Sequence, residues 1–269
     1  MMTHYIHGST SIEQKRLDAL NTLINDSSLR VMVLEGTERV LDVGSGLGQL
    51  TRAIARRAGT VIGIERDPQQ IAACNALAAA EGEQGLVEIR QGDVNAFPLQ
   101  DDEWGSFDVA HSRFLLEHVS NPSDVVSQMV RAVRPGGRII LEDDDHDLLR
   151  LWPEPDGLMA VWKAYCNSYT VVGNDPLIGR KLGSLLHHSG AHIRRATWLF
   201  FGASAGESEF VLYVDNLAVI LEGARGLMVR NRLIKDSEFE KGLTSLRQWR
   251  SRPDAVFWYA RAWVEGERA

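Results

Sequence analysis

Short apolar runs alternate with longer, more polar segments through the first half of the chain. The runs predict strands at 39–43, 60–65, 87–91, 107–112 and 138–142. Helices are expected to begin at Gln49, at Pro68 after an Asp67 cap, and at Pro122 after Asn121, ending near 58, 80 and 133. Strands that alternate with helices across short turns are typical of a parallel, doubly wound α/β sheet.

The flanking segments are more helical. Ser11 and Gln14 form a capping-box pattern that predicts an N-terminal helix after a polar-aromatic arm. Beyond residue 147 the pattern predicts helices over 157–169 and 176–189, a strand over 193–202, mostly helix over 207–250 and a strand over 255–263. We therefore expect an arm and helix (1–38), a core (39–147), and a remainder (148–269) whose helical insertions, at about 150–175 and 207–250, form a lid.

Composition narrows the class of protein. The 269 residues are 44% apolar and 24% charged, as in ordinary globular chains. A net charge of −7 argues against binding to nucleic acid or to an anionic membrane surface. Two cysteines, a polar N-terminus and no apolar run of about 20 residues predict a cytoplasmic protein without a membrane span. No metal site is predicted, and a homodimer is left open.

The first predicted strand runs directly into a glycine-rich turn, V-L-D-V-G-S-G-L-G at 40–48. Gly44, Gly46 and Gly48 allow positive φ and a close approach of ligand to backbone, with Ser45 inside the turn. The spacing is G-x-G-x-G rather than the G-x-G-x-x-G typical of dinucleotide binding. Asp42 would repel a pyrophosphate but suits a cationic amino group, such as the α-ammonium of S-adenosylmethionine (SAM).

Two later strand ends complete a nucleoside site. Glu65 ends the second strand, where a carboxylate can accept hydrogen bonds from both ribose hydroxyls, and Arg66 is a candidate to face the adenine. Gly92, Asp93 and Val94 follow the third strand, and we expect this loop to bind the adenine amino group and a ring nitrogen. The alternatives are an ordinary polar strand end for Glu65 and a local turn for Asp93.

Candidates for the transfer site are fewer. Ser112 and Arg113, at the end of the fourth strand, are expected to border the sulfonium, and the Asn-Pro-Pro-Tyr type of sequence used on flipped bases is absent. His146, in the acidic run 142–147, is a candidate general base; the alternative is a solvated loop. Tyr5 and His7 are candidates to cover the cofactor, the alternative being a frayed terminus.

Together, the segments 42–48, 65, 92–93, 116–119 and 134–137 resemble the motifs of class I SAM-dependent methyltransferases, of the kind that includes the ubiquinone and menaquinone biosynthesis enzymes. The resemblance covers about 39–142. It implies a Rossmann-like, seven-stranded, mostly parallel sheet, SAM as cofactor, and methyl transfer to a small-molecule O-, N- or C-acceptor. A nicotinamide-dependent oxidoreductase is disfavoured by the turn spacing and Asp42. A SAM-binding regulatory protein without turnover stays an alternative.

Overall fold

The structure is a computed structural model that describes residues 11–269. Its helices are α1 (Ser11–Val31), α2 (Gln49–Ala55), α3 (Pro68–Ala80), α4 (Pro122–Ala132), α5 (Leu158–Val171), α6 (Leu182–His188), α7 (Ser208–Arg230) and α8 (Asp236–Trp249). Its strands are β1 (Arg39–Val43), β2 (Thr60–Glu65), β3 (Glu88–Gln91), β4 (Phe107–Arg113), β5 (Val133–Asp144), β6 (Arg150–Trp152), β7 (Ala191–Ser204) and β8 (Val256–Arg268). The chain divides into two compact units, which we call the core unit (Leu23–Asp144, Ile178–Leu199 and Ala262–Ala269) and the helical unit (11–22, Asp145–Leu177 and Phe200–Arg261).

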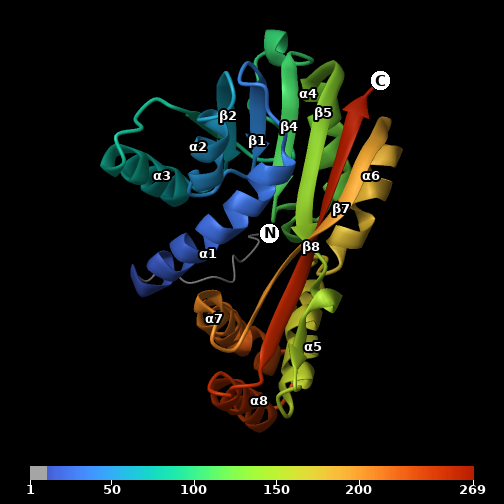
Figure 1. Ribbon diagram of the computed structural model, residues 1–269. Helices are drawn as coiled ribbons and strands as arrows, with labels where there is room; N and C mark the ends of the chain where they lie inside the picture. The colour runs from blue at the N-terminus through green and yellow to red at the C-terminus, as the bar shows by residue number, and fades with distance from the viewer. Residues whose placement is uncertain (1–10) are drawn as a thin grey trace. The chain divides into compact units, whose positions relative to one another are not determined.

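The core unit is a twisted sheet whose strand order reverses once. Its strands lie in the order β3-β2-β1-β4-β5, with the end of β8 beside β5, and the first five are parallel (Figure 1). From β1 the chain builds outward to β2 and β3, then returns to the other side of β1 with β4 and β5. In open parallel sheets, ligands bind beyond the carboxyl ends of the strands at such a reversal. The fold therefore predicts a ligand site at the carboxyl ends of β1 and β4.

Helices cover both faces of this sheet (Figure 1). One face packs Val40, Val109 and Ile140 against α1 and α2, with Trp263 of β8 fully buried among them. The other face packs Leu41 and apolar neighbours against α4 and α6. Because alternate residues of a strand point to opposite faces, the continuous apolar runs of these strands are what a sheet buried on both sides requires.

In the helical unit, β6 pairs antiparallel with the first part of β8, and Leu151 lies opposite Phe257. Tyr213 of α7 stacks on Phe257 with ring centroids 5.6 Å apart. The helices α5, α7 and α8 pack against one another, and α5 and α8 meet where a Cβ on Gly242 would lie 2.9 Å from the Gly157 carbonyl oxygen. Only a glycine fits at that point of the helix crossing.

The α/β class, the doubly wound parallel sheet and most of the predicted elements are confirmed. The described residues hold eight strands rather than seven, because the three residues of β6 pair with β8. The strand expected from 138 begins at Val133, which pairs with Phe107 before the register shifts to Val109 and Arg138. The segment 207–250 is two helices, α7 and α8. The segment 176–189 is a 3₁₀ turn (Ile178–Lys181) followed by α6.

Candidate cofactor-binding site

The glycine turn joins β1 to α2 in the conformation that its sequence requires. Gly44, Gly46 and Gly48 all have positive φ, at 80°, 54° and 68°. A Cβ on Gly48 would lie 2.3 Å from the Cys74 sulfur, so a larger residue there would have to displace the Cys74 side chain as well as adopt a positive φ. The backbone N–H groups of Gly44 and Ser45 donate to the Ile64 carbonyl oxygen at 2.9 and 3.0 Å. These bonds fix the turn against the end of β2.

Glu65 reaches across to this turn from the end of β2. Its Oε2 accepts the Gly46 backbone N–H at 2.9 Å, and its Oε1 accepts the N–H groups of Arg66 and Asp67, each at 2.9 Å. The carboxylate is therefore held beside the turn by three backbone donors. Its position at the end of the strand next to β1 is the one from which a carboxylate receives ribose hydroxyls in dinucleotide folds.

Asp42 lies under the turn, not on its surface. Its side chain is 4% exposed. Its Oδ2 accepts the Thr51 hydroxyl at 2.6 Å, and its Oδ1 lies 2.8 Å from Nδ1 of His111. Burial by itself would raise the pKa of the Asp42 carboxyl, but the bonds from His111 and Thr51 and the nearby Arg113 charge outweigh it, so the pKa is lowered. Both oxygens are thus occupied by partners that sequence reasoning did not identify.

The loop after β3 is hydrogen-bonded to a side chain of α4. Gln128 of α4 donates to the Val94 carbonyl oxygen at 3.1 Å and accepts the Phe97 backbone N–H at 3.1 Å. Asp93 is exposed, and its Oδ1 accepts the backbone N–H of Asn95 at 2.8 Å. A Cβ on Gly92 would lie 2.5 Å from the Pro98 ring, so glycine is required there by packing. Asp93 carries out the local turn role that was its alternative interpretation, and its carboxylate remains on the surface.

At the end of β4 the two predicted residues differ in environment. Ser112 is fully buried, and its hydroxyl has no hydrogen-bond partner among the described residues. The Arg113 guanidinium donates to Asn25 Oδ1 at 2.7 Å and to Ser28 Oγ at 3.3 Å, so α1 holds it. Phe114, directly after, has φ 52°, an uncommon value for an aromatic residue. Strain of this kind gathers at functional sites, which fits a loop at the strand reversal.

The acidic run 142–147 begins within the last residues of β5, which belong to the core unit. Asp143 is fully buried, and its Oδ2 accepts the Leu116 backbone N–H at 2.8 Å. Burial raises the pKa of Asp143 well above its usual value, with the charges of Glu117 and Asp144 acting in the same direction. Glu142 is also buried and accepts the Ser28 hydroxyl at 2.9 Å. These two carboxyl groups are not the solvated loop that an acidic run suggests.

His146 belongs to the helical unit, in a buried aromatic cluster with Trp162, Tyr165, Tyr169 and Tyr259. Its Nδ1 lies 2.7 Å from the Tyr259 hydroxyl, and its carbonyl oxygen accepts the Trp162 indole N–H at 2.8 Å. The ring centroids of Trp162, Tyr165 and Tyr169 lie 5.0–5.7 Å from the His146 ring. Tyr259 therefore orients the imidazole. Tyr5 and His7 lie outside the described residues.

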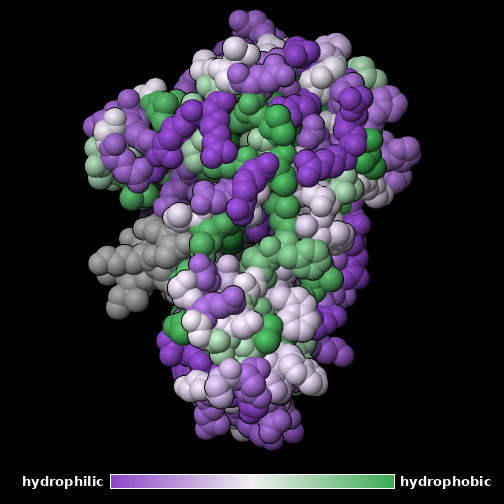
Figure 2. Space-filling model, in the orientation of Figure 1, coloured by the Kyte–Doolittle hydropathy of each residue, from purple (hydrophilic) through white to green (hydrophobic). Residues whose placement is uncertain are grey.

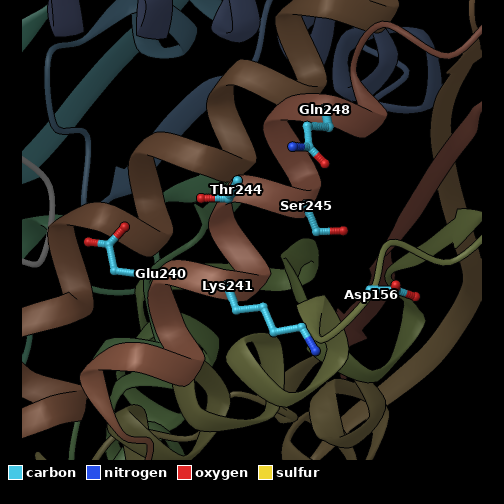
Figure 3. Close-up of a pocket in the computed structure, with 6 residues that line it drawn as sticks. All are labelled: Asp156, Glu240, Lys241, Thr244, Ser245 and Gln248. Carbon is cyan, nitrogen blue, oxygen red and sulfur yellow. The ribbon is translucent and has the colours of Figure 1, made fainter.

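The helical unit has a shallow hollow on its surface. Its volume is about 350 Å³, and polar side chains line it (Figure 3): Asp156, Glu240, Lys241, Thr244, Ser245 and Gln248. The surface over α8 is largely hydrophilic (Figure 2). None of the six side chains holds a buried polar atom without a partner. We assign no function to this hollow.

Comparison with known proteins identifies the region that carries the glycine turn. Residues 41–141 match the family described as "Methyltransferase domain". The matched stretch begins inside β1, ends inside β5, and contains the glycine turn, Glu65 and the loop after β3. The chain contains a class I SAM-dependent methyltransferase domain. The resemblance stated from the sequence motifs is confirmed.

Relatives of known sequence match parts of the chain. An uncharacterised 37.1 kDa protein in transposon TN4556 of Streptomyces fradiae is 32% identical over 191 residues, which are 66% of this chain and 52% of that protein. A ubiquinone biosynthesis O-methyltransferase of Paracidovorax citrulli is 39% identical over 101 residues, 37% of this chain and 40% of that protein. The chain thus spans about half the length of the curated relatives that it matches.

A solved structure extends the likeness beyond the matched domain. Geranyl diphosphate C-methyltransferase from Streptomyces coelicolor aligns with a TM-score of 0.56 and 13% identity, covering 97% of this chain and 85% of that one. At this identity the alignment establishes the fold alone.

Among residues 11–269, no helix combines the length and apolar character needed to cross a membrane.

Proposed function

We propose that the chain transfers the methyl group of SAM to a small-molecule acceptor. The observation that carries the proposal is the geometry of the glycine turn, where the Glu65 carboxylate accepts the Gly46 N–H at 2.9 Å at the reversal of strand order. The Asp42 carboxylate is buried directly before the turn, where its negative charge disfavours a pyrophosphate. This favours a sulfonium cofactor over a dinucleotide, and the domain match agrees.

In this proposal the turn residues Gly44, Ser45, Gly46 and Gly48 bind the methionine end of the cofactor. Glu65 binds the ribose hydroxyls. The loop of Gly92, Asp93 and Val94 receives the adenine, with Arg66 at its edge. When bound, SAM supplies an electrophilic methyl group, and the chain contributes orientation and exclusion of water, which account for much of the acceleration in a direct displacement. Ser112 and Arg113 border the transfer site, and Asp42 acts on the turn through Thr51.

The acceptor is proposed to be a small organic molecule, and the helical insertions at about 150–175 and 207–250 are proposed to be the lid that selects it. Support comes from their aromatic content, since apolar pockets with few polar groups are the usual sites for such ligands. His146 is the proposed base for an acceptor that must lose a proton, oriented by Tyr259. His146→Ala is expected to slow transfer to a hydroxyl acceptor without changing SAM affinity. Equal turnover would show that alignment alone suffices.

We further propose that the protein acts in the cytoplasm, binds no nucleic acid and associates as a homodimer. Large side chains exposed on strands of the helical unit support a self-association surface: Trp152 is 66% exposed and Phe200 is 71% exposed. Sedimentation equilibrium over a range of concentrations tests the dimer. A monomer at all concentrations contradicts it.

The test of the function is a titration with SAM and with NAD, followed by transfer of a labelled methyl group to a panel of phenols, amines and carbon acids. Binding of SAM but not NAD, with release of S-adenosylhomocysteine, supports the proposal. Binding of NAD alone favours the oxidoreductase. Tight binding of SAM with no turnover on any acceptor favours the regulatory alternative.

A further inference from the structure

Arg52 of α2 is a buried arginine that contacts the glycine turn, with only 1% of its side chain exposed. Its Nε donates to Glu83 at 2.9 Å, and one Nη donates to Glu81 at 3.3 Å; both glutamates follow the end of α3. The other Nη donates to the Leu47 carbonyl oxygen at 3.4 Å and lies 4.0 Å from the Cys74 sulfur. One guanidinium thus contacts the turn, α3 and the segment after α3.

Helix α3 packs against the glycine turn through two residues one helical turn apart, Gln70 and Cys74. A Cβ on Gly46 would lie 3.4 Å from the Gln70 amide oxygen. A Cβ on Gly48 would lie 2.3 Å from the Cys74 sulfur and 3.6 Å from the nearest Nη of Arg52. The turn therefore has little free space on this side, and its shape depends on the position of α3.

The two ends of α3 are held by different groups. At the N-terminal end, Glu65 accepts the Asp67 backbone N–H at 2.9 Å. At the C-terminal end, the ion pairs of Arg52 with Glu81 and Glu83 join the segment after α3 to α2. The desolvation of a buried ion pair offsets much of its attraction, so such a pair is weak evidence of added stability. What these pairs fix is the position of α3 beside the turn.

Resting on the function proposed above, we propose that Arg52 is a positioning residue for the methionine end of SAM. It acts through the Leu47 carbonyl and through α3, which together fix the shape of the turn 44–48. The nucleoside end of the site is held separately, because two of the three backbone donors to Glu65, those of Arg66 and Asp67, lie outside the turn. Loss of Arg52 should therefore weaken only ligands that carry the amino-acid end.

The experiment is calorimetric titration of the full chain with SAM and with methylthioadenosine, which has the nucleoside and sulfur of SAM but lacks its amino-acid end. The fitted stoichiometry reports the folded fraction, and the dissociation constant reports the site. Arg52→Met removes the guanidinium, and Arg52→Lys keeps a positive charge. Arg56→Met is the matched control, because Arg56 pairs with the same Glu81 and Glu83 but is 49% exposed and, among the described residues, donates no hydrogen bond to the turn.

We expect Arg52→Met to bind SAM about five- to tenfold more weakly than the wild type, because a turn that is no longer held loses part of its hydrogen bonding to the ligand. Its affinity for methylthioadenosine should change by less than about twofold, since the nucleoside groups share no partner with Arg52. Arg52→Lys should recover part of the SAM affinity, because an ammonium replaces only part of the guanidinium fork. Arg56→Met should bind both ligands as the wild type does.

The outcomes separate the two proposals. A wild type that fails to bind SAM contradicts the proposed function itself. Unchanged SAM affinity in Arg52→Met, equal losses for SAM and methylthioadenosine, or an equal loss of SAM affinity in Arg56→Met leaves the function standing and overturns the role of Arg52. Should Arg52→Met fail to fold, Arg52→Lys decides: a loss confined to SAM supports the role, and no loss or an equal loss for both ligands overturns it.

Discussion

At the scale of single residues, the carboxylate of Glu65 is oriented before any ligand arrives. Three backbone N–H groups donate to it, from Gly46, Arg66 and Asp67. A side chain held by the main chain loses little conformational freedom when it binds, so its hydrogen bonds to a ligand retain most of their value. The same donors explain why the acid stands at the end of β2, where the chain turns into α3.

Replacement of Glu65 tests this role. Glu65→Ala is expected to lower SAM affinity by about 1–3 kcal/mol, the range for losing hydrogen bonds to a charged group, and Glu65→Gln by less, because one acceptor oxygen remains. Calorimetric titration measures the difference. Glu35→Gln, at an exposed glutamate before β1, is the matched control and should bind as the wild type does. Equal affinities for all four proteins would remove Glu65 from the site.

At the scale of elements, the Glu103 carboxylate links strands β1 and β3. Glu103 accepts Arg39 of β1 at 2.8 Å and Arg90 of β3 at 2.5 and 2.9 Å, and it accepts the Gln100 backbone N–H at 2.8 Å. The bonds from Arg90 outweigh burial and lower the pKa of Glu103 from 4.5 to about 2. Since the side chain is only 9% exposed, solvent screens this network weakly.

This pKa predicts how unfolding depends on pH. A carboxyl whose folded pKa is lowered contributes stability above the unfolded value of 4.5 and loses it as pH falls toward about 2. We expect Glu103→Gln to cost about 1–3 kcal/mol at neutral pH and to make the acid decline shallower. Glu88→Gln removes a 59% exposed partner of the same Arg90 and should cost well under ~1 kcal/mol. Denaturant unfolding measured between neutral pH and about pH 2 tests this prediction. If the free energy of unfolding falls equally with pH in Glu103→Gln and in the wild type, the lowered pKa of Glu103 is not the cause of the decline.

The crossing of α5 and α8 permits a second test at this scale. A Cβ on Gly242 would lie 2.6 Å from a Val161 methyl and 2.9 Å from the Gly157 carbonyl oxygen. Gly242→Ala should therefore destabilise by about 1–3 kcal/mol, the cost of overpacking. Gly226→Ala on α7 is the control, because its Cβ would meet only the flexible end of Arg230, and the gain in helix propensity should leave stability unchanged or higher. Thermal unfolding compares the two, and equal midpoints would contradict the close helix contact.

At the scale of the whole molecule, the sheet topology brings the proposed cofactor-binding residues together. Strands β1, β2, β3 and β4 are parallel neighbours, so the residues that follow each of them stand at one edge of the sheet. Segments about 20 residues apart in sequence thereby form one site. The order reverses beside β1, which leaves room there for a ligand that helices would otherwise cover.

Binding at that edge must stabilise the entire fold. At a SAM concentration of a hundred times Kd, linkage predicts about 2.7 kcal/mol of added stability. For a chain of this size that raises the thermal midpoint by roughly 5–10 °C. Scanning calorimetry with SAM, with NAD and without ligand measures the shift. Glu65→Ala should show a smaller shift at the same concentration of SAM, and a rise with NAD alone would contradict the site.

The sequence by itself determined the parallel α/β core, the glycine turn and the acidic residue that ends the second strand, Glu65. These signals are local: positive-φ glycines, an Asp-Pro cap and short apolar runs act within a few residues of one another. Only the tertiary structure decided the partners of Asp42, since His111 stands 69 residues away and meets it through strand pairing. The same reason explains β6, whose three residues become a strand by pairing with β8. Contacts of high sequence separation depend on where the sheet places each strand, and no local pattern encodes that position.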